Sequence, residues 1–201
     1  MKNVALAFLI AAGTAVPEDR LPPLRAGDLT DAQRTAAAQF VGSRGKQVFG
    51  PFVPLLRSPE LMSAAAAMGD HLRFHSTLPA AVREMAILLT CREWTQQYEW
   101  SVHLKLALEA GLRRDMVDAV ADGRRVYGAT EELEVAISLV SEVLAHKRVS
   151  DVTWRRALQH LGESGTVDLL GVVGYYSFLG VVLNAARTPA PDGAQLTRFP
   201  D

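Results

Sequence analysis

The sequence is nearly devoid of cysteine: Cys91 is the single thiol among 201 residues. A disulfide within the chain, a CxxC redox pair and a cysteine-based zinc site each need at least two thiols, so all three are excluded. A lone cysteine at the end of an apolar run, here "ILLTC", is typical of a small buried hydrophobic residue. We therefore expect Cys91 to be buried rather than reactive.

A surplus of charge of either sign is also missing. The chain has 21 Lys and Arg against 22 Asp and Glu, for a formal net charge of −1. No basic stripe of the kind that nucleic acid requires is present, so nucleic-acid binding is not expected. Apolar residues make up 49% of the sequence, which in a chain of this length is enough for one domain with a sizeable core.

Sustained period-two alternation, long linkers, low-complexity tracts and internal repeats are all lacking. Apolar residues instead recur at helical spacing between Gly, Pro and short polar breaks, which predicts an all-α domain. Capping residues and Gly or Pro stops define the expected helices. They cover residues 30–49, 58–74, 79–94, 96–110, 114–121, 130–146, 150–162 and 166–186.

The N-terminus has the pattern of a secretory signal peptide. One lysine precedes an apolar run over residues 4–12, and small residues follow at 13–15. We expect a signal peptide over residues 1–15 and a single domain over 16–201. The mature protein would then be periplasmic or secreted; without cleavage it would be cytoplasmic, with a packed N-terminal helix.

The segment "VDLLGVVGYYSFLGVVLNAA" approaches the ~20 residues that cross a bilayer. It also contains Asp168, Asn184, three glycines and two tyrosines, which are unusual in a membrane span. A core helix, or one covered by another subunit, explains its composition better. No membrane span is expected.

Three titratable residues share the apolar faces of two adjacent expected helices. Glu84 is followed by apolar residues at +3, +4 and +7, so it lies on their stripe. Glu99 and His103 are four residues apart, and apolar residues continue their face. Buried carboxylates need a partner or a proton, and an imidazole beside them can titrate near neutrality. His103 is therefore a candidate general acid and base, oriented by Glu99 or Glu84.

Other interpretations of these residues stay open. They could form a structural buried network, or an exposed Glu–His pair on a solvated face. Two glutamates and a histidine could also bind zinc or iron, although no HExxH spacing is present and we assign no metal ligand.

The stretch "LPAAVREMAILLTCREWTQQYEWSVHLKLALEAGL" resembles the core motif of the carboxymuconolactone decarboxylase-like family, which includes the alkylhydroperoxidase D group. The flanking "GPFVPLLRSPELM", "LRFHSTLP" and "VVGYYSFLGVVLNA" resemble the branch that carries YEW and a histidine instead of two cysteines. The resemblance implies an alkylhydroperoxidase D-like bundle of about seven to eight helices. It also implies assembly into dimers, trimers or hexamers.

In the peroxidase members of this family, a glutamate, a CxxC pair and a histidine act together. Matched to this sequence, the glutamate falls on Glu84, the two cysteines on Gln96 and Glu99, and the histidine on His103. The acid and the imidazole are kept, but both thiols are missing. Thiol-based peroxide reduction needs a nucleophilic and a resolving thiol, so a peroxiredoxin-type activity is disfavoured.

The decarboxylase members imply a reaction without a cofactor on a small cyclic, lactone-type carboxylic acid. Such a site needs a cation for the substrate carboxylate, for which Arg83 and Arg92 are the candidates near the motif. Tyr98 and Trp100 could line a pocket for a ring, with Gln96 beside them, although aromatic residues on such helices are as often core. A non-catalytic oligomeric binding protein is the remaining alternative.

Overall fold

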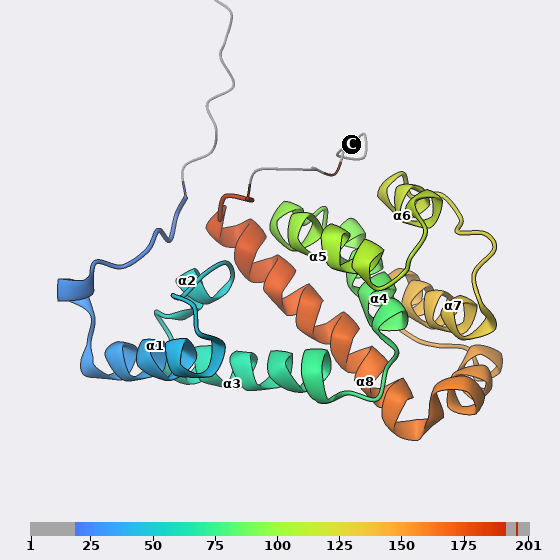
Figure 1. The fold of residues 1–201 in the computed structure, drawn as a ribbon, viewed down its shortest axis with the longest axis horizontal. Coiled ribbons are helices and arrows are strands. Elements are labelled where there is room, and N and C mark those ends of the chain that lie inside the picture. The colour runs from blue at the N-terminus through green and yellow to red at the C-terminus, as the bar shows by residue number, and fades with distance from the viewer. Residues whose placement is uncertain (1–18, 192–195, 197–201) are drawn as a thin grey trace, which may run out of the picture.

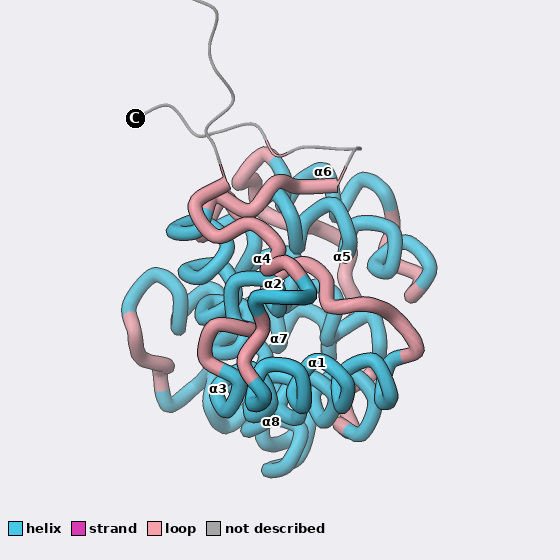
Figure 2. The backbone as a smooth tube through the Cα atoms, turned by 90° about the vertical axis from the view of Figure 1, so that its left-hand side faces the viewer, coloured by secondary structure: helices cyan, strands magenta, loops and turns pink. Residues whose placement is uncertain are grey.

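The computed structural model describes residues 19–191 and residue 196 (Figure 1). The signal peptide expected over residues 1–15 lies outside this part of the chain. Figure 2 shows helices and loops but no strand in the described residues, so the all-α prediction is confirmed.

The helices follow one another through short connections. The α-helices are α1 (Asp31–Arg44), α2 (Phe52–Leu55), α3 (Pro59–Asp70), α4 (Ala80–Glu93), α5 (Gln97–Glu109), α6 (Arg114–Ala121), α7 (Glu131–His146) and α8 (Asp151–Ala186). Two short elements accompany them: a 3₁₀ turn η1 (Ala26–Asp28) and a π-helical turn η2 (His71–His75).

Helix α8 runs through the middle of the fold. It packs against α4 and α7, and the pair α1 and α3 lies along its other side (Figure 1). Its buried residues include Leu169, Val172, Tyr176 and Leu183, at the spacing of one inward face. By length and composition α8 is one helix that could cross a membrane, but half of its most apolar stretch is buried in the fold. Burial of that kind is typical of a core helix.

Helix α8 contains two of the predicted helices. Separate helices over 150–162 and 166–186 were expected, and Asp151–Ala186 consists of two helical segments that meet at a kink at Gly162. Gly162 has φ 69° and ψ 176°, which only glycine adopts readily. The glycine therefore ends the first segment where expected, and the predicted division into two helices is confirmed.

Two further boundaries differ from the prediction near the N-terminus. Helix α1 ends at Arg44 rather than near residue 49, because Gly45 takes the left-handed conformation that caps helices. Helix α3 ends at Asp70, and the chain continues to His75 as the π-helical turn η2. A π turn changes which side chains point inward, and such turns are frequent at functional sites.

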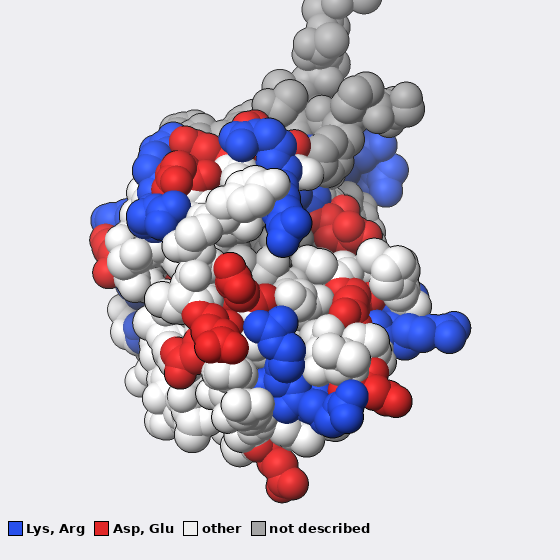
Figure 3. Space-filling view, turned by 90° about the vertical axis from the view of Figure 1, so that its right-hand side faces the viewer, with Lys and Arg blue, Asp and Glu red and all other residues white. Residues whose placement is uncertain are grey.

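The surface over α6 and α7 has charges of both signs. Figure 3 shows Lys and Arg interspersed with Asp and Glu on this face. Arg114 pairs with Asp118 along α6 at 2.8 Å, and Arg124 with Asp122 beyond it at the same distance. Exposed pairs of this kind contribute little to stability.

Candidate functional site

The candidate site is built around His103 on α5. Glu84 on α4 accepts a hydrogen bond from Nδ1 of His103, with 2.7 Å between Nδ1 and Oε2. Because a carboxylate can only accept, we assign the proton of the neutral imidazole to Nδ1. Nε2 is then the basic atom of the ring.

The other ring nitrogen meets two groups. The hydroxyl of Tyr176 on α8 lies 3.1 Å from Nε2 of His103 and can donate to it. Oε2 of Glu99 lies 3.5 Å from the same nitrogen. The expected meeting of Glu84, Glu99 and His103 in the interior is therefore confirmed, and each of the three side chains is buried.

The two glutamates approach opposite nitrogens of the imidazole. Glu84 holds Nδ1 and Glu99 faces Nε2, so the three side chains do not converge on one point from which a metal ion could be ligated. Within the described residues, no group of three or more His, Cys, Asp or Glu has an arrangement that could hold a metal ion. Each ring nitrogen of His103 therefore has a different carboxylate as its neighbour.

Burial shifts the acid–base properties of the groups near Nε2. Desolvation raises the pKa of Glu99 above its ordinary value, and the charges of His103 and Arg73 offset part of this effect. Desolvation and the charge of Glu99 raise the pKa of Tyr176 well above the usual phenol value. Tyr176 is therefore a hydrogen-bond donor at neutral pH, and Glu99 is a carboxyl group that retains its proton more readily than an exposed glutamate.

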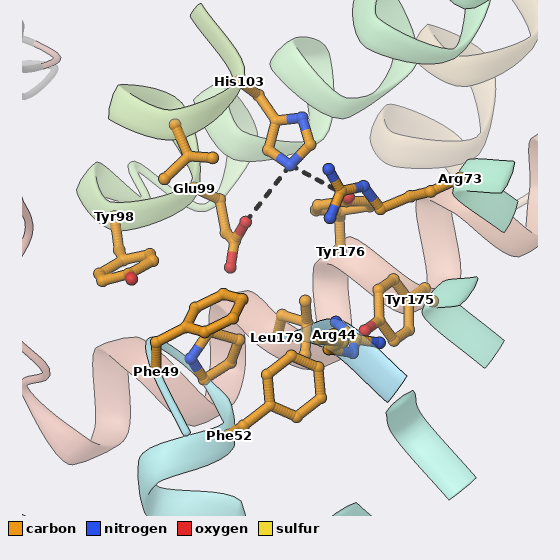
Figure 4. A pocket seen from close by; sticks show the side chains of 13 residues that line it. Arg44, Phe49, Phe52, Arg73, Tyr98, Glu99, His103, Tyr175, Tyr176 and Leu179 are labelled. Atoms are coloured by element: carbon orange, nitrogen blue, oxygen red, sulfur yellow. Dashed lines mark hydrogen bonds and ion pairs between the residues drawn. The ribbon is translucent and has the colours of Figure 1, made fainter. Parts of the chain in front are cut away.

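His103 and Glu99 line a small pocket between α5, α8 and the segment before α2, here called the inner pocket (Figure 4). The cavity itself is small, about 40 Å³, and the surrounding non-atom space reaches about 420 Å³ only when open solvent is included. Its wall is largely aromatic, and it contains two arginines. The lining residues are Arg44, Phe49, Pro51, Phe52, Gly69, Arg73, Tyr98, Glu99, Val102, His103, Tyr175, Tyr176 and Leu179.

Two glycines allow tyrosines to reach this pocket. A Cβ on Gly50, where φ is +54°, would lie 2.8 Å from ring atoms of Tyr98. A Cβ on Gly69 would lie 2.8 Å from Cζ of Tyr175 and would overlap its hydroxyl oxygen. Both glycines therefore shape the wall by the absence of a side chain.

Of the residues predicted to bind substrate, Tyr98 lines the inner pocket and the others lie elsewhere. Trp100 is 3% exposed and packs in the hydrophobic core. Gln96 caps α5 by accepting from the backbone N–H of Glu99 at 2.9 Å, and it donates to Asn184 at 3.1 Å. These positions do not support contact with a ligand in this pocket, because the helical register turns both side chains into the protein.

The two arginines predicted for substrate binding also lie outside the pocket lining. Nε of Arg83 is 3.6 Å from Oε1 of Glu84, so Arg83 places a positive charge beside the carboxylate that accepts from Nδ1 of His103. Arg92 is buried on α4, where the charge of Asp122 at the end of α6 acts on it. Arg44 and Arg73 are the arginines at the pocket. Arg73 lies in the flanking stretch "LRFHSTLP", but neither arginine was predicted as a site residue.

Tyr176 was also missed as a member of the site. It lies 73 residues from His103 in sequence, and only the tertiary structure, in which α4 packs against both α5 and α8, brings them together. Their rings pack edge to face, with centroids 5.0 Å apart. One sequence signal was present, since a tyrosine on the buried face of an apolar helix needs a partner for its hydroxyl.

The comparisons with known proteins bear on the family and the fold. Residues 59–142 match the carboxymuconolactone decarboxylase family. This confirms the resemblance inferred from the sequence, over a segment that contains Glu84, Gln96, Glu99 and His103. Comparison with curated proteins gives no match.

Two solved structures show the same fold as this chain. A variant of the debrominase Bmp8, in complex with 2,3,4-tribromopyrrole, has 13% identity and a TM-score of 0.65, covering 86% of this chain and 91% of that one. A protein of unknown function from Agrobacterium tumefaciens, provisionally described as an antioxidant defence protein AhpD, has 14% identity and a TM-score of 0.59. That match covers 69% of this chain and 96% of the other. The alkylhydroperoxidase D-like fold is thereby confirmed.

Proposed function

We propose that this protein is a cofactor-independent, carboxymuconolactone decarboxylase-like enzyme that transfers a proton during decarboxylation of a small cyclic, lactone-type carboxylic acid. The observation that carries the proposal is the position of Nε2 of His103. It faces the inner pocket, while Nδ1 is held by Glu84 at 2.7 Å. An imidazole oriented by a carboxylate at one nitrogen can give and take a proton at the other.

His103, Glu84, Glu99 and Tyr176 suffice for the proposed reaction. Breaking the bond to the carboxylate releases carbon dioxide and leaves an electron pair on the ring carbon, delocalised into a conjugated carbonyl group. Protonated Nε2 of His103 delivers a proton to carbon, and Glu84 stabilises the imidazolium before this step. His103 then takes a new proton from solvent, and Tyr176 and Glu99 keep Nε2 directed at the pocket.

The solved relatives support a ring-sized ligand but not a particular reaction. The debrominase structure contains 2,3,4-tribromopyrrole, a small planar ring, within the same fold. The inner pocket of this chain has an aromatic wall that includes Phe49, Phe52 and Tyr98, and its cavity of about 40 Å³ has to widen to admit a ring. Planar rings pack favourably against such aromatic faces.

The state of Cys91 argues against a thiol peroxidase. The side chain is 2% exposed, and burial together with the charges of Glu99 and Glu84 raises the pKa of its thiol well above the usual value. Peroxide reduction needs an accessible thiolate, and this thiol is neither accessible nor ionised at neutral pH. A non-catalytic binding protein would use the same pocket without turnover.

A His103→Gln variant tests the proposed function. Decarboxylation of a panel of lactone-type acids, followed by release of carbon dioxide, should fall by about 10²-fold to 10⁴-fold, the usual range for a lost general acid or base. Lys105→Gln is the matched control, because Lys105 is on the same helix with its side chain 80% exposed. Unchanged turnover in a folded His103→Gln protein would contradict the role of His103. Absence of turnover by the unmodified protein on the whole panel would favour the binding protein.

A further inference from the structure

Arg73 is a cation at the inner pocket without an acidic partner. It lies in the π-helical turn η2, between α3 and the loop that leads to α4. Within the part of the chain that the structure describes, Arg73 forms no hydrogen bond or ion pair, and its one close aromatic contact is with the ring of Phe74, 5.0 Å from Cζ to the centroid. Its charge nevertheless acts on Glu99, Tyr175 and Tyr176.

Arg44, the other cation of the inner pocket, is already engaged. Its Nη2 donates to Oδ1 of Asp70 at 2.6 Å and to the carbonyl oxygen of Ala66 at 3.0 Å. Its guanidinium also lies over the rings of Phe40 and Phe52, at 4.7 Å and 4.8 Å from their centroids. Arg44 therefore ties α1 to α3, and Arg73 is the guanidinium left for a ligand.

A second cavity also has Arg73 in its lining. This outer pocket has about 880 Å³ of space, open solvent included, and shares Arg44, Phe49 and Arg73 with the inner pocket. Its remaining lining residues are Ser43, Lys46, Asp70, Phe74 and His75. Its one acid, Asp70, is paired with Arg44, so the cavity has an excess of positive charge. Such a cavity attracts anions and concentrates them near the inner pocket.

The two cavities differ in the side chains that line them. The outer pocket has the cations Lys46 and Arg73, whereas the inner pocket has aromatic walls and the imidazole of His103. Figure 4 shows Arg73 and Glu99 on either side of the His103 ring nitrogen, and the charge of Arg73 acts on both Glu99 and Tyr176. A ligand with a planar ring and a carboxylate would match the aromatic wall of the inner pocket and the cations of the outer pocket.

We propose that Arg73 is the specificity-determining residue of this site and selects planar ring compounds with a carboxylate, which arrive through the outer pocket. The carboxylate is held by the Arg73 guanidinium and the ring lies against the aromatic wall. This inference rests on the proposed function for the presence of substrate at His103, but the binding step that it describes does not need turnover. It assigns to Arg73 the part expected from the sequence for Arg83 or Arg92.

Calorimetric titration with benzoate and with its uncharged analogue benzamide tests the assignment. Benzoate should bind the unmodified protein, and Arg73→Gln should weaken that binding by at least about tenfold, the usual loss for a charge-assisted pair. The benzoate affinity of Arg73→Lys should lie between those of the unmodified protein and Arg73→Gln, because lysine keeps the charge but lacks the planar guanidinium that binds a carboxylate through two hydrogen bonds. Benzamide should bind weakly to both the unmodified protein and Arg73→Gln.

Two further variants separate the outer pocket from a general charge effect. Lys46→Met should weaken benzoate binding a few-fold, because Lys46 lines the outer pocket but not the inner pocket. Arg114→Gln is the matched control, since Arg114 lies on α6, away from α1 and α3 in both backbone views (Figures 1 and 2). It should leave the affinity unchanged.

Several results would overturn the inference. The first is that Arg73→Gln binds benzoate as tightly as the unmodified protein. The others are that the unmodified protein binds benzamide as tightly as benzoate, that it does not bind benzoate at all, and that Lys46→Met has no effect on benzoate binding.

Failure of the proposed reaction would give a different result. In that case Arg73-dependent benzoate binding persists although no cyclic acid is decarboxylated. Conversely, His103-dependent turnover with an unchanged KM in Arg73→Gln would retain the reaction and refute the role of Arg73.

Discussion

Glu84 and His103 are 19 residues apart in sequence, and the carboxylate of one lies 2.7 Å from Nδ1 of the other. They face each other because α4 and α5 form a hairpin whose inward faces both contain a titratable residue. The pair fixes the orientation of the imidazole and leaves Nε2 for Tyr176, Glu99 and the inner pocket.

Replacing Glu84 with Gln should lower kcat strongly and should lower the stability of the folded protein only slightly. Gln keeps the size of the side chain and can still accept from Nδ1–H, but it no longer provides the charge that stabilises an imidazolium. We expect kcat to fall by about 10²-fold or more, with KM little changed. Steady-state kinetics measure kcat and KM, and thermal unfolding measures the stability of the variant. A rise in KM at constant kcat would assign Glu84 to substrate binding instead.

Glu99 should make the stability of the protein depend on pH. Burial raises the pKa of its carboxyl, so the folded state keeps a proton that the unfolded chain has already lost. The free energy of unfolding should therefore fall as pH rises from the ordinary glutamate range through the folded pKa. Each unit of difference between the two pKa values corresponds to about 1.4 kcal/mol.

A Glu99→Gln variant isolates this effect, because a neutral amide takes the place of the protonated carboxyl. Urea unfolding from about pH 4 to about pH 8 should show the variant gaining stability relative to the unmodified protein as pH rises. A difference that stays constant over this range would mean that Glu99 has the same pKa in both states.

Cys91 should be dispensable for activity. We expect Cys91→Ala to leave turnover unchanged, because the thiol is buried on α4 and does not line the inner pocket. The lost sulfur should cost about 1 kcal/mol of stability, as for other small deletions in a core. In the native protein the thiol should react with a disulfide reagent only on unfolding. Hydroperoxide consumption that disappears in Cys91→Ala would reverse the conclusion on peroxidase activity.

Gly69 should not tolerate a side chain. The new methyl of Gly69→Ala would overlap the Tyr175 hydroxyl in the pocket wall. We expect a loss of about 1–3 kcal/mol, the usual cost of overpacking. Adding Tyr175→Phe should restore part of it.

Gly42→Ala is the matched control for this substitution. Gly42 is on α1, and a Cβ there would meet no atom within 4 Å. The change should stabilise the protein by about 0.5–1 kcal/mol, since glycine is unfavourable inside a helix. Chemical denaturation of all variants measures these differences. Equal effects of Gly42→Ala and Gly69→Ala would rule out the contact with Tyr175 as the cause.

The sequence by itself determined what depends on spacing along a single helix. Apolar periodicity placed Glu84 on the buried face of α4, and Glu99 and His103 on that of α5. It also set most helix boundaries and, through the single cysteine, the lack of a thiol pair. These features are local, since each helix fixes its own faces through 3.6 residues per turn.

Only the tertiary structure decided which faces meet. Tyr176 reaches Nε2 because α8 runs through the centre of the fold, and Arg73 reaches the inner pocket from the π-helical turn η2. Arg92, by contrast, is within the motif in sequence but does not line the inner pocket. Contacts between distant helices depend on how the whole core packs, and no spacing within one segment encodes that arrangement.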